Sequence, residues 1–322
     1  MPSYKKITKN IQEVTIDNPK TPNDKLIWLN INNAGKREVE FLRKQYKFDI
    51  RYLHASLSKA RAQRPIIRKE NDYLFMILHF PIFKDSTILP AEIEFFIGHG
   101  YLITIHDNNL TSLNDFFNIC KKDSGSILAY EFESSAILLY EILEKLMDNC
   151  FNLLDKNSIV INNVEDIIFA QEQKSAVSKI LSLRHNIINF RKIIQNHKNI
   201  MKKLTGMESG LVPSQEIKDY YNRLLEKSKR IWENLENQRE MIEVLNSTNE
   251  SLLNYRLSDI MKTLTIFSVI VFPLTLLAAI FGMNTMKGMP LVNHPLGFWI
   301  IIIVMLIGCL GMLLFFERKR WL

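Results

Sequence analysis

The sequence lacks the patterns that mark the common enzyme and metal-binding classes. Its three cysteines, Cys120, Cys150 and Cys309, are far apart, and none belongs to a CxxC pair. That spacing argues against a disulfide framework and against a thiolate metal site. There is no P-loop, GxGxxG or GxSxG motif, and the seven histidines form no HExxH pair. The one nucleophile set that can be assembled, His106-Asp107 with Cys120, has no supporting context, so an enzyme is not predicted.

Charge is absent from two long stretches near the C-terminus. Residues 263–286 contain no Asp, Glu, Lys or Arg, and after Lys287 none appears until Glu317. About 18 or more consecutive apolar residues are enough to cross the core of a bilayer as a helix. The pattern therefore predicts a two-helix membrane hairpin, joined by a short turn and preceded by a large, charged body.

The flanks of the hairpin predict its orientation. Arg256 and Lys262 precede the first span, and three basic residues follow the second: Arg318, Lys319 and Arg320. The positive-inside rule places both flanks in the cytoplasm and the turn outside the cell. The membrane is expected to be the cell (inner) membrane. Residues 1–20 have no apolar core of the kind that signal peptides carry, so the body is expected to remain in the cytoplasm. The net charge of +7 is spread among acids, which favours a solvated surface over nucleic-acid binding.

The first 125 residues mix strand and helix patterns. Strands are predicted at 25–32, 72–82, 93–97 and 101–106, and helices at 36–46, 56–62 and 110–120. Gly98-His99-Gly100 is typical of a tight hairpin turn between two of the strands. We therefore predict an α+β cytosolic domain over residues 1–125.

Glycine and proline are missing from residues 128–204, where apolar residues recur at three- and four-residue steps. Two long helices are predicted there, with a break at 156–158 and the second helix running over about 162–203. From 214 to 281 there is one proline, Pro273, and no glycine. This predicts one helix of roughly 100 Å at 1.5 Å per residue. An apolar seam with a coiled-coil period runs along this helix and consists of Leu224, Ile231, Leu235, Ile242 and Leu245. Such a seam needs other helices to pack against. The long-helix region is placed at 126–257 and the membrane hairpin at 258–322.

Small and polar residues recur on one face of the first span. Ser258, Thr265, Ser268, Thr275 and Ala279 are separated by steps of seven, three, seven and four, with Met261 and Phe272 beside them. Close helix packing and pore lining both account for this spacing. The second span, 296–316, is apolar on all sides, as expected of a helix that faces lipid.

Gly282-Met283-Asn284 stands at the outer end of the first span. One interpretation is a helix terminus capped by Gly282, with Asn284 in the turn. The other is a ring of Asn284 carbonyl oxygens from symmetric copies, which would bind the water shell of a small hard cation. Mg²⁺ releases its water reluctantly, so reading the hydrated ion is chemically sensible.

Together these residues resemble the CorA family of divalent-cation transporters, the two-transmembrane Gly-x-Asn type. The likeness lies in Gly282-Met283-Asn284 after a proline-containing span, in Met261-Lys262-x-Leu264-Thr265, in Pro273-Leu274-Thr275 and in the basic tail. It extends to the soluble part through Trp28, Arg64-Pro65 and the 72–75 strand. Coverage is essentially the whole chain.

The resemblance implies a funnel-shaped homopentamer in a lipid bilayer, with no cofactor besides the transported ion. The implied pore-facing residues are Asn284, Thr275, Ser268, Phe272, Thr265, Leu264, Met261 and Ser258. Gly282 and Met283 would shape the outer mouth. Arg318, Lys319 and Arg320 would form a basic collar at the inner membrane edge. Asp219 matches the position of a cytosolic regulatory acid, although Asn222 and Arg223 follow it instead of further acids.

The function predicted on this basis is passive, gated transport of divalent cations. Mg²⁺ is the first choice, with Co²⁺ and Ni²⁺ as further ions. Two alternatives stay open: a zinc transporter of the same superfamily, coupled to protons, and a membrane-anchored scaffold that carries no ion. The outer loop has Lys287 where family members often carry an acid, which leaves the choice among Mg²⁺, Co²⁺, Ni²⁺ and Zn²⁺ open.

Overall fold

A computed structural model describes residues 3–17, 25–57, 64–122, 134–170, 173–206, 215–283, 290–291, 294–319 and 321. The chain separates into two compact units, Met1–Asn246 and Ser247–Leu322. The division into three parts at 1–125, 126–257 and 258–322 remains a prediction.

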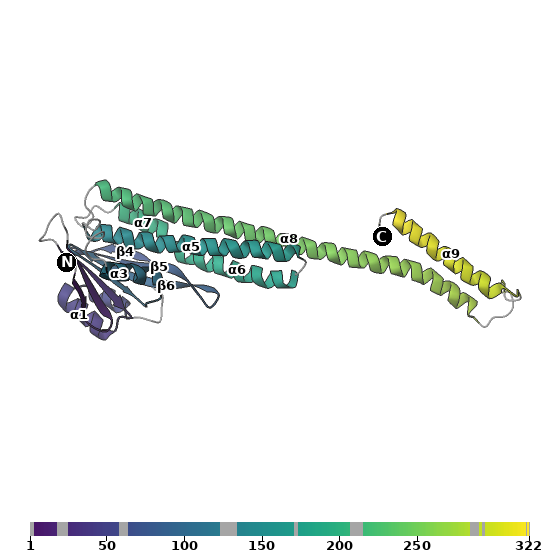
Figure 1. The fold of residues 1–322 in the computed structure, drawn as a ribbon, viewed down its shortest axis with the longest axis horizontal. Coiled ribbons are helices and arrows are strands. Elements are labelled where there is room, and N and C mark those ends of the chain that lie inside the picture. Colours follow the sequence, from purple (N-terminus) through teal and green to yellow (C-terminus); the bar gives the residue numbers. More distant parts are fainter. Residues whose placement is uncertain are drawn as a thin grey trace. The chain divides into compact units, whose positions relative to one another are not determined.

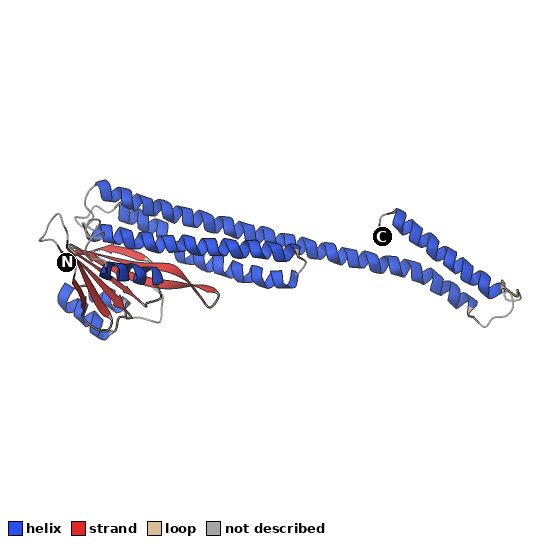
Figure 2. Cartoon of the chain, viewed as in Figure 1, coloured by secondary structure: helices blue, strands red, loops and turns tan. Residues whose placement is uncertain are grey.

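A seven-stranded mixed sheet organises the first unit, in the order β1-β2-β3-β7-β6-β5-β4 (Figure 2). The strands are β1 Ser3–Lys6, β2 Ile11–Asp17, β3 Lys25–Asn32, β4 Ile66–Lys69, β5 Tyr73–Lys84, β6 Thr87–Gly98 and β7 Tyr101–His106. Neighbours pair antiparallel except β3 with β7, which are parallel. The four predicted strands are confirmed as β3, β5, β6 and β7. The predicted turn between β6 and β7 is also confirmed, and its Gly100 has a positive φ of 75°.

Three strands were not predicted from the sequence: β1, β2 and β4. β1 and β4 are four residues each, too short for a periodic signal. β2 does place apolar residues toward the core, since Ile11, Val14 and Ile16 are buried. Its place in the sheet comes from pairing with β3 along its whole length, a contact that the local sequence does not reveal.

Two short helices, α1 Lys36–Tyr46 and α2 Ile50–Ala55, lie on one face of the sheet, with α1 visible in Figure 1. The core on this face includes Phe48, Phe75 and Phe96. Of the helix predicted at 56–62, only Ser56 and Leu57 are described, and both lie in a turn. The backbone N–H of Arg51 donates to the Asp49 carboxylate, which starts α2 six residues earlier, and the helix ends at Ala55. Residues 58–62 of that prediction lie outside the described chain, so this part of it remains a prediction.

The other face carries α3 Thr111–Lys122, α5 Ser135–Phe169, α6 Gln173–Ile194 and α7 His197–Thr205 (Figure 1). The break predicted at 156–158 is wrong, because α5 runs through it without interruption. The Gln238 amide donates to the Leu154 carbonyl at 2.7 Å and to the Ser158 hydroxyl at 2.9 Å. These hydrogen bonds from the helix that carries Gln238 stabilise the polar stretch 156–158 in helical form, although its sequence is typical of a loop. The second long helix, predicted over about 162–203, is not one helix. Residues 162–169 belong to α5, and α6 and α7 follow, with α7 ending before Gly206 as expected.

Helix α8, Gln215–Phe281, is continuous for 67 residues, as predicted. Its predicted seam is buried: Leu224, Ile231, Leu235, Ile242 and Leu245. Within the first unit α8 runs parallel to α5. The Tyr221 hydroxyl donates to the Ala136 carbonyl, and the Lys227 ammonium contacts Glu144 at 2.8 Å and Asp148 at 2.7 Å. The second unit holds the rest of α8 and α9, Gly297–Arg318, which confirms the second predicted span.

A buried carboxyl, Glu94 on β6, gives the fold a pH dependence. Its side chain is 3% exposed, and the Ser56 hydroxyl donates a hydrogen bond to it. Burial raises the Glu94 pKa from 4.5 to about 8; the Ser56 bond lowers it, and the charge on Glu92 raises it further. The folded protein therefore keeps this proton over a pH range in which the unfolded chain has lost it.

We expect the stability of the first unit to fall as pH rises from about 4.5 to 8, because only the folded state binds the Glu94 proton there. Glu94→Gln keeps the shape without the titration, so it should remove this decline. At pH 8 it should gain on the order of a few kcal/mol over the original protein. Guanidinium unfolding between pH 5 and 9 measures this. Glu40→Gln, at an exposed site on α1, should leave the decline unchanged.

Candidate functional site

Two helices of the second unit have the length and apolarity to cross a membrane. They are the C-terminal part of α8 and the whole of α9. Large apolar side chains are exposed around both, including Phe267 (64%), Phe272 (73%) and Leu306 (56%). Exposed apolar surface on this scale is unfavourable in water and favourable in lipid or against other protein.

Three hydroxyl groups on the predicted pore face of α8 share one hydrogen-bonding pattern. Thr265 donates to the Met261 carbonyl at 2.7 Å, Ser268 to the Leu264 carbonyl at 2.8 Å and Thr275 to the Val271 carbonyl at 2.9 Å. The proton of each hydroxyl is thus used within the helix. Each oxygen keeps its lone pairs as acceptors, the polarity that the water shell of a cation needs.

The other predicted residues of this face lie on the same helix. Met261, Leu264 and Phe272 are 67%, 62% and 73% exposed in the single chain, and Ser258 is also exposed. Seven-residue and three- or four-residue steps keep them on one side of the helix. Pro273, inside α8, has no N–H to donate to the preceding turn, yet the helix continues through it to Phe281.

Helix α8 ends at the start of the Gly-Met-Asn motif. The Gly282 N–H donates to the Ala278 carbonyl at 2.9 Å, and the Met283 N–H to the Ile280 carbonyl at 3.3 Å. Gly282 is not among the described residues with positive φ, so backbone conformation does not require glycine there. A Cβ at this position would lie 3.1 Å from the Ala278 oxygen, which is a crowded contact. Asn284 and Lys287 lie outside the described residues.

The basic tail closes α9. Arg318 is in the last turn, and the Lys319 N–H donates to the Phe315 carbonyl at 3.2 Å. Trp321 stacks on Phe316, with ring centroids 6.0 Å apart. Arg320 is not described.

Asp219 lies exposed near the start of α8. Among the described residues no group of three or more His, Cys, Asp or Glu side chains is placed to hold a metal ion. Asp219 thus belongs to no such three-residue group in the part that the structure covers.

The surroundings of His106 and Cys120 disfavour the nucleophile set of His106-Asp107 with Cys120. One ring nitrogen of His106 contacts the Asn30 amide oxygen at 2.9 Å, and the other accepts from the Asn108 N–H at 3.2 Å. Burial lowers the His106 pKa to about 4 and raises the Cys120 pKa to about 12. A raised pKa favours the protonated thiol at neutral pH, and a thiol is a poor nucleophile compared with a thiolate.

Comparison with protein families identifies the chain. The model of the family described as CorA-like Mg²⁺ transporter protein matches residues 23–319. The chain belongs to this family. The CorA match covers strands β3 to β7 of the sheet, the long helices, both apolar spans and the Gly-Met-Asn motif between them, and it begins after β1 and β2. Two relatives of the chain are described as cobalt/magnesium transport proteins.

Individual relatives agree with this assignment. A cobalt/magnesium transport protein CorA from Methanocaldococcus jannaschii is 22% identical, over 97% of this chain and 96% of its own. The putative metal ion transporter YfjQ of Bacillus subtilis is 23% identical, over 97% and 94% of the two chains. Among solved structures, the complete CorA magnesium transporter from M. jannaschii matches with a TM-score of 0.83 at 21% identity, covering 97% and 96%. Full-length CmaX matches with a TM-score of 0.71 at 19% identity, covering 93% and 90%. The two structures establish the fold.

Proposed function

We propose that this CorA family protein is the subunit of a passive, gated pathway for divalent cations, with Mg²⁺ as the first choice and Co²⁺ and Ni²⁺ as further ions. The observation that carries the proposal is the family match over residues 23–319, which includes Gly282-Met283-Asn284 at the exit of the first of two apolar spans. Relatives described as cobalt/magnesium transport proteins support the ion class.

The pathway would be enclosed by five copies of α8. One helix cannot surround an ion, but five related helices can turn the face with Thr265, Ser268 and Thr275 toward a common axis. Their hydroxyl oxygens would accept hydrogen bonds from the waters around the ion, and Asn284 carbonyls would do the same at the outer mouth. Helix α9, apolar on all sides, would face lipid, and Arg318, Lys319 and Arg320 would form the inner collar.

The membrane potential would supply the driving force. The sequence has no ATP-binding loop. Moving one charge through 100 mV is worth about 2.3 kcal/mol, and a divalent ion gains twice that. In the proposed orientation both termini lie in the cytoplasm. A cytoplasm that is negative relative to the outside would then draw the cation into the cell. Asp219, shared between copies, is the residue that we propose for sensing the cytosolic ion.

Ion flux into vesicles that contain the purified protein tests the proposal. Mg²⁺, Co²⁺, Ni²⁺ and Zn²⁺ are assayed in parallel, with and without a pH step across the membrane. Flux of Mg²⁺ that is independent of the pH step supports the proposal. Zinc flux driven by the pH step would support the proton-coupled zinc alternative, and absence of flux for every ion would support the scaffold.

We expect Phe272→Ala to raise the resting flux of Mg²⁺ several-fold. An apolar ring at a narrow point keeps water out of the path, and a smaller side chain lets the path fill. Phe267→Ala is the matched control, because Phe267 is also exposed on α8 (64%) but five residues away, on a different side of the helix. Equal effects of the two substitutions would contradict the assignment of Phe272 to the pore.

A further inference from the structure

The charge distribution of the first unit points to an anion, although the protein belongs to a cation-transport family. From Gln173 to Gly206, α6 and α7 carry eight basic residues and no Asp or Glu: Lys174, Lys179, Arg184, Arg191, Lys192, Lys198, Lys202 and Lys203. The preceding helix α5 is the reverse, with six acids and two bases between Ser135 and Phe169. The net charge of the whole chain hides this segregation, which a count of charges over each predicted helix reveals.

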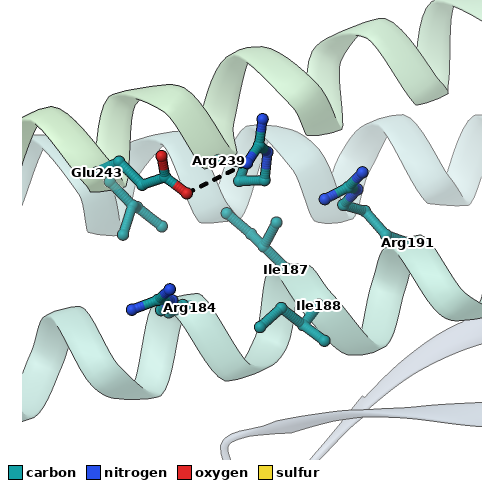
Figure 3. A pocket seen from close by; sticks show the side chains of 7 residues that line it. Arg184, Ile187, Ile188, Arg191, Arg239 and Glu243 are labelled. Carbon is teal, nitrogen blue, oxygen red and sulfur yellow. Dashed lines mark hydrogen bonds and ion pairs between the residues drawn. The ribbon is translucent and has the colours of Figure 1, made fainter.

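A pocket of about 190 Å³ lies between α6 and α8 within this basic region. Figure 3 shows Arg184 and Arg191 at its two ends on α6, with Ile187 and Ile188 between them. Ile242 also lines the pocket, and Arg239 and Glu243 contribute from α8. Seven residues of helix separate the two α6 arginines, which corresponds to about 10 Å along the axis.

The three arginines differ in how well they are paired. Arg191 contacts the Glu236 carboxylate and lies over the Trp232 ring, 5.1 Å from its centroid. Arg239 contacts Glu236 at 3.1 Å and Glu243 at 3.2 Å. In the described part of the chain no carboxylate lies within ion-pair distance of Arg184.

Arg191 also has an unsatisfied donor. Its Nε is shielded from solvent and has no hydrogen-bond acceptor among the described residues. A buried donor without an acceptor is costly, and Arg191 lines the pocket, where acceptor oxygens could enter. Three guanidinium groups face two carboxylates, so the pocket has one positive charge in excess, and the surrounding lysines add to it.

We propose that this pocket binds a small phosphate-bearing anion. Guanidinium groups are planar forks that bind phosphate oxygens in pairs, and they stay charged at all relevant pH values. Arg184, free of a competing carboxylate, would bind the phosphate, and Arg191 and Arg239 would complete the charge. The volume suits phosphate or pyrophosphate and is smaller than the ~300–1,000 Å³ of pockets for drug-sized ligands. The site does not depend on the proposed ion transport.

Calorimetric titration of the purified full-length protein with sodium pyrophosphate, in magnesium-free buffer, tests the site. We expect Arg184→Gln to weaken binding about tenfold, because it removes one charge-assisted pair of hydrogen bonds. Lys179→Gln is the control: it removes the same charge from an exposed position on the same helix outside the pocket, and should leave the affinity unchanged. A parallel titration with dihexanoyl phosphatidic acid distinguishes a lipid headgroup from a free phosphate as the source, and either would support a phosphate site.

Two outcomes would overturn the proposal. One is the absence of binding by both compounds. The other is an equal loss of affinity in Arg184→Gln and Lys179→Gln, which would mean that the anion is attracted by the general charge of α6 and α7 and not by the pocket. Thermal unfolding of both variants, expected to match that of the original protein, shows that neither substitution acts through misfolding.

Discussion

Asn284→Ala is expected to reduce Mg²⁺ uptake to background while the subunits still assemble. The proposed role of Asn284 is to present carbonyl oxygens to the hydrated ion at the outer mouth, and alanine has no acceptor there. Losing one acceptor in each copy removes the whole ring at once, so the effect should exceed that of a single hydrogen bond. Uptake by vesicles measures the flux, and size-exclusion chromatography measures assembly.

Asn293→Ala is the matched control, because it makes the same change in the segment between the two spans but outside the motif. It should retain most of the flux. If Asn284→Ala transports Mg²⁺ at the original rate, the ring of amides is not the selective element. If it fails to assemble, the loss of flux carries no information about selectivity, and Asn284→Gln, which keeps the amide, then separates chemistry from shape.

Leu235→Ala is expected to destabilise the first unit by about 2–5 kcal/mol, the usual cost of removing a fully buried leucine. Leu235 is 0% exposed on α8, in the seam that packs α8 against the helices of the first unit. Guanidinium unfolding followed by circular dichroism gives the change in free energy.

Met241→Ala provides the comparison for Leu235→Ala. Met241 lies on the same helix but is 49% exposed, so its truncation should change the stability by less than ~0.5 kcal/mol. Equal destabilisation by the two substitutions would mean that the seam is not the main source of the stability of α8.

Secondary-structure elements whose pattern lies within the local sequence were predictable, and elements that depend on contacts with distant residues were not. The strands β5 and β7 are apolar runs, of 12 and 6 residues, whose signal lies within the local sequence. The break expected at 156–158 is a run of Lys, Asn and Ser that resembles a loop, but the Gln238 amide binds there from a helix 80 residues later. Helix α2 was not predicted: it begins at the Asp49 cap and ends at Ala55, before the helix expected at 56–62, of which only Ser56 and Leu57 are described.

The candidate site divides in the same way. The position of its α8 residues on one face follows from spacing along one helix, which the sequence contains in full, whereas their proposed pore role comes from the resemblance to the CorA family. The arginine pocket combines α6 with α8, and Glu94 is buried by strands and a loop that meet only in the fold. No spacing rule connects such residues.

The sequence by itself determined the two apolar spans, the unbroken α8 and the family, because apolar runs, missing helix breakers and a three-residue motif are properties of contiguous chain. Tertiary structure decided the order of the sheet, the course of α5, the proton held on Glu94 and the pairing of α6 with α8. Those features depend on which side chains exclude water from one another, and that is fixed only when distant segments pack.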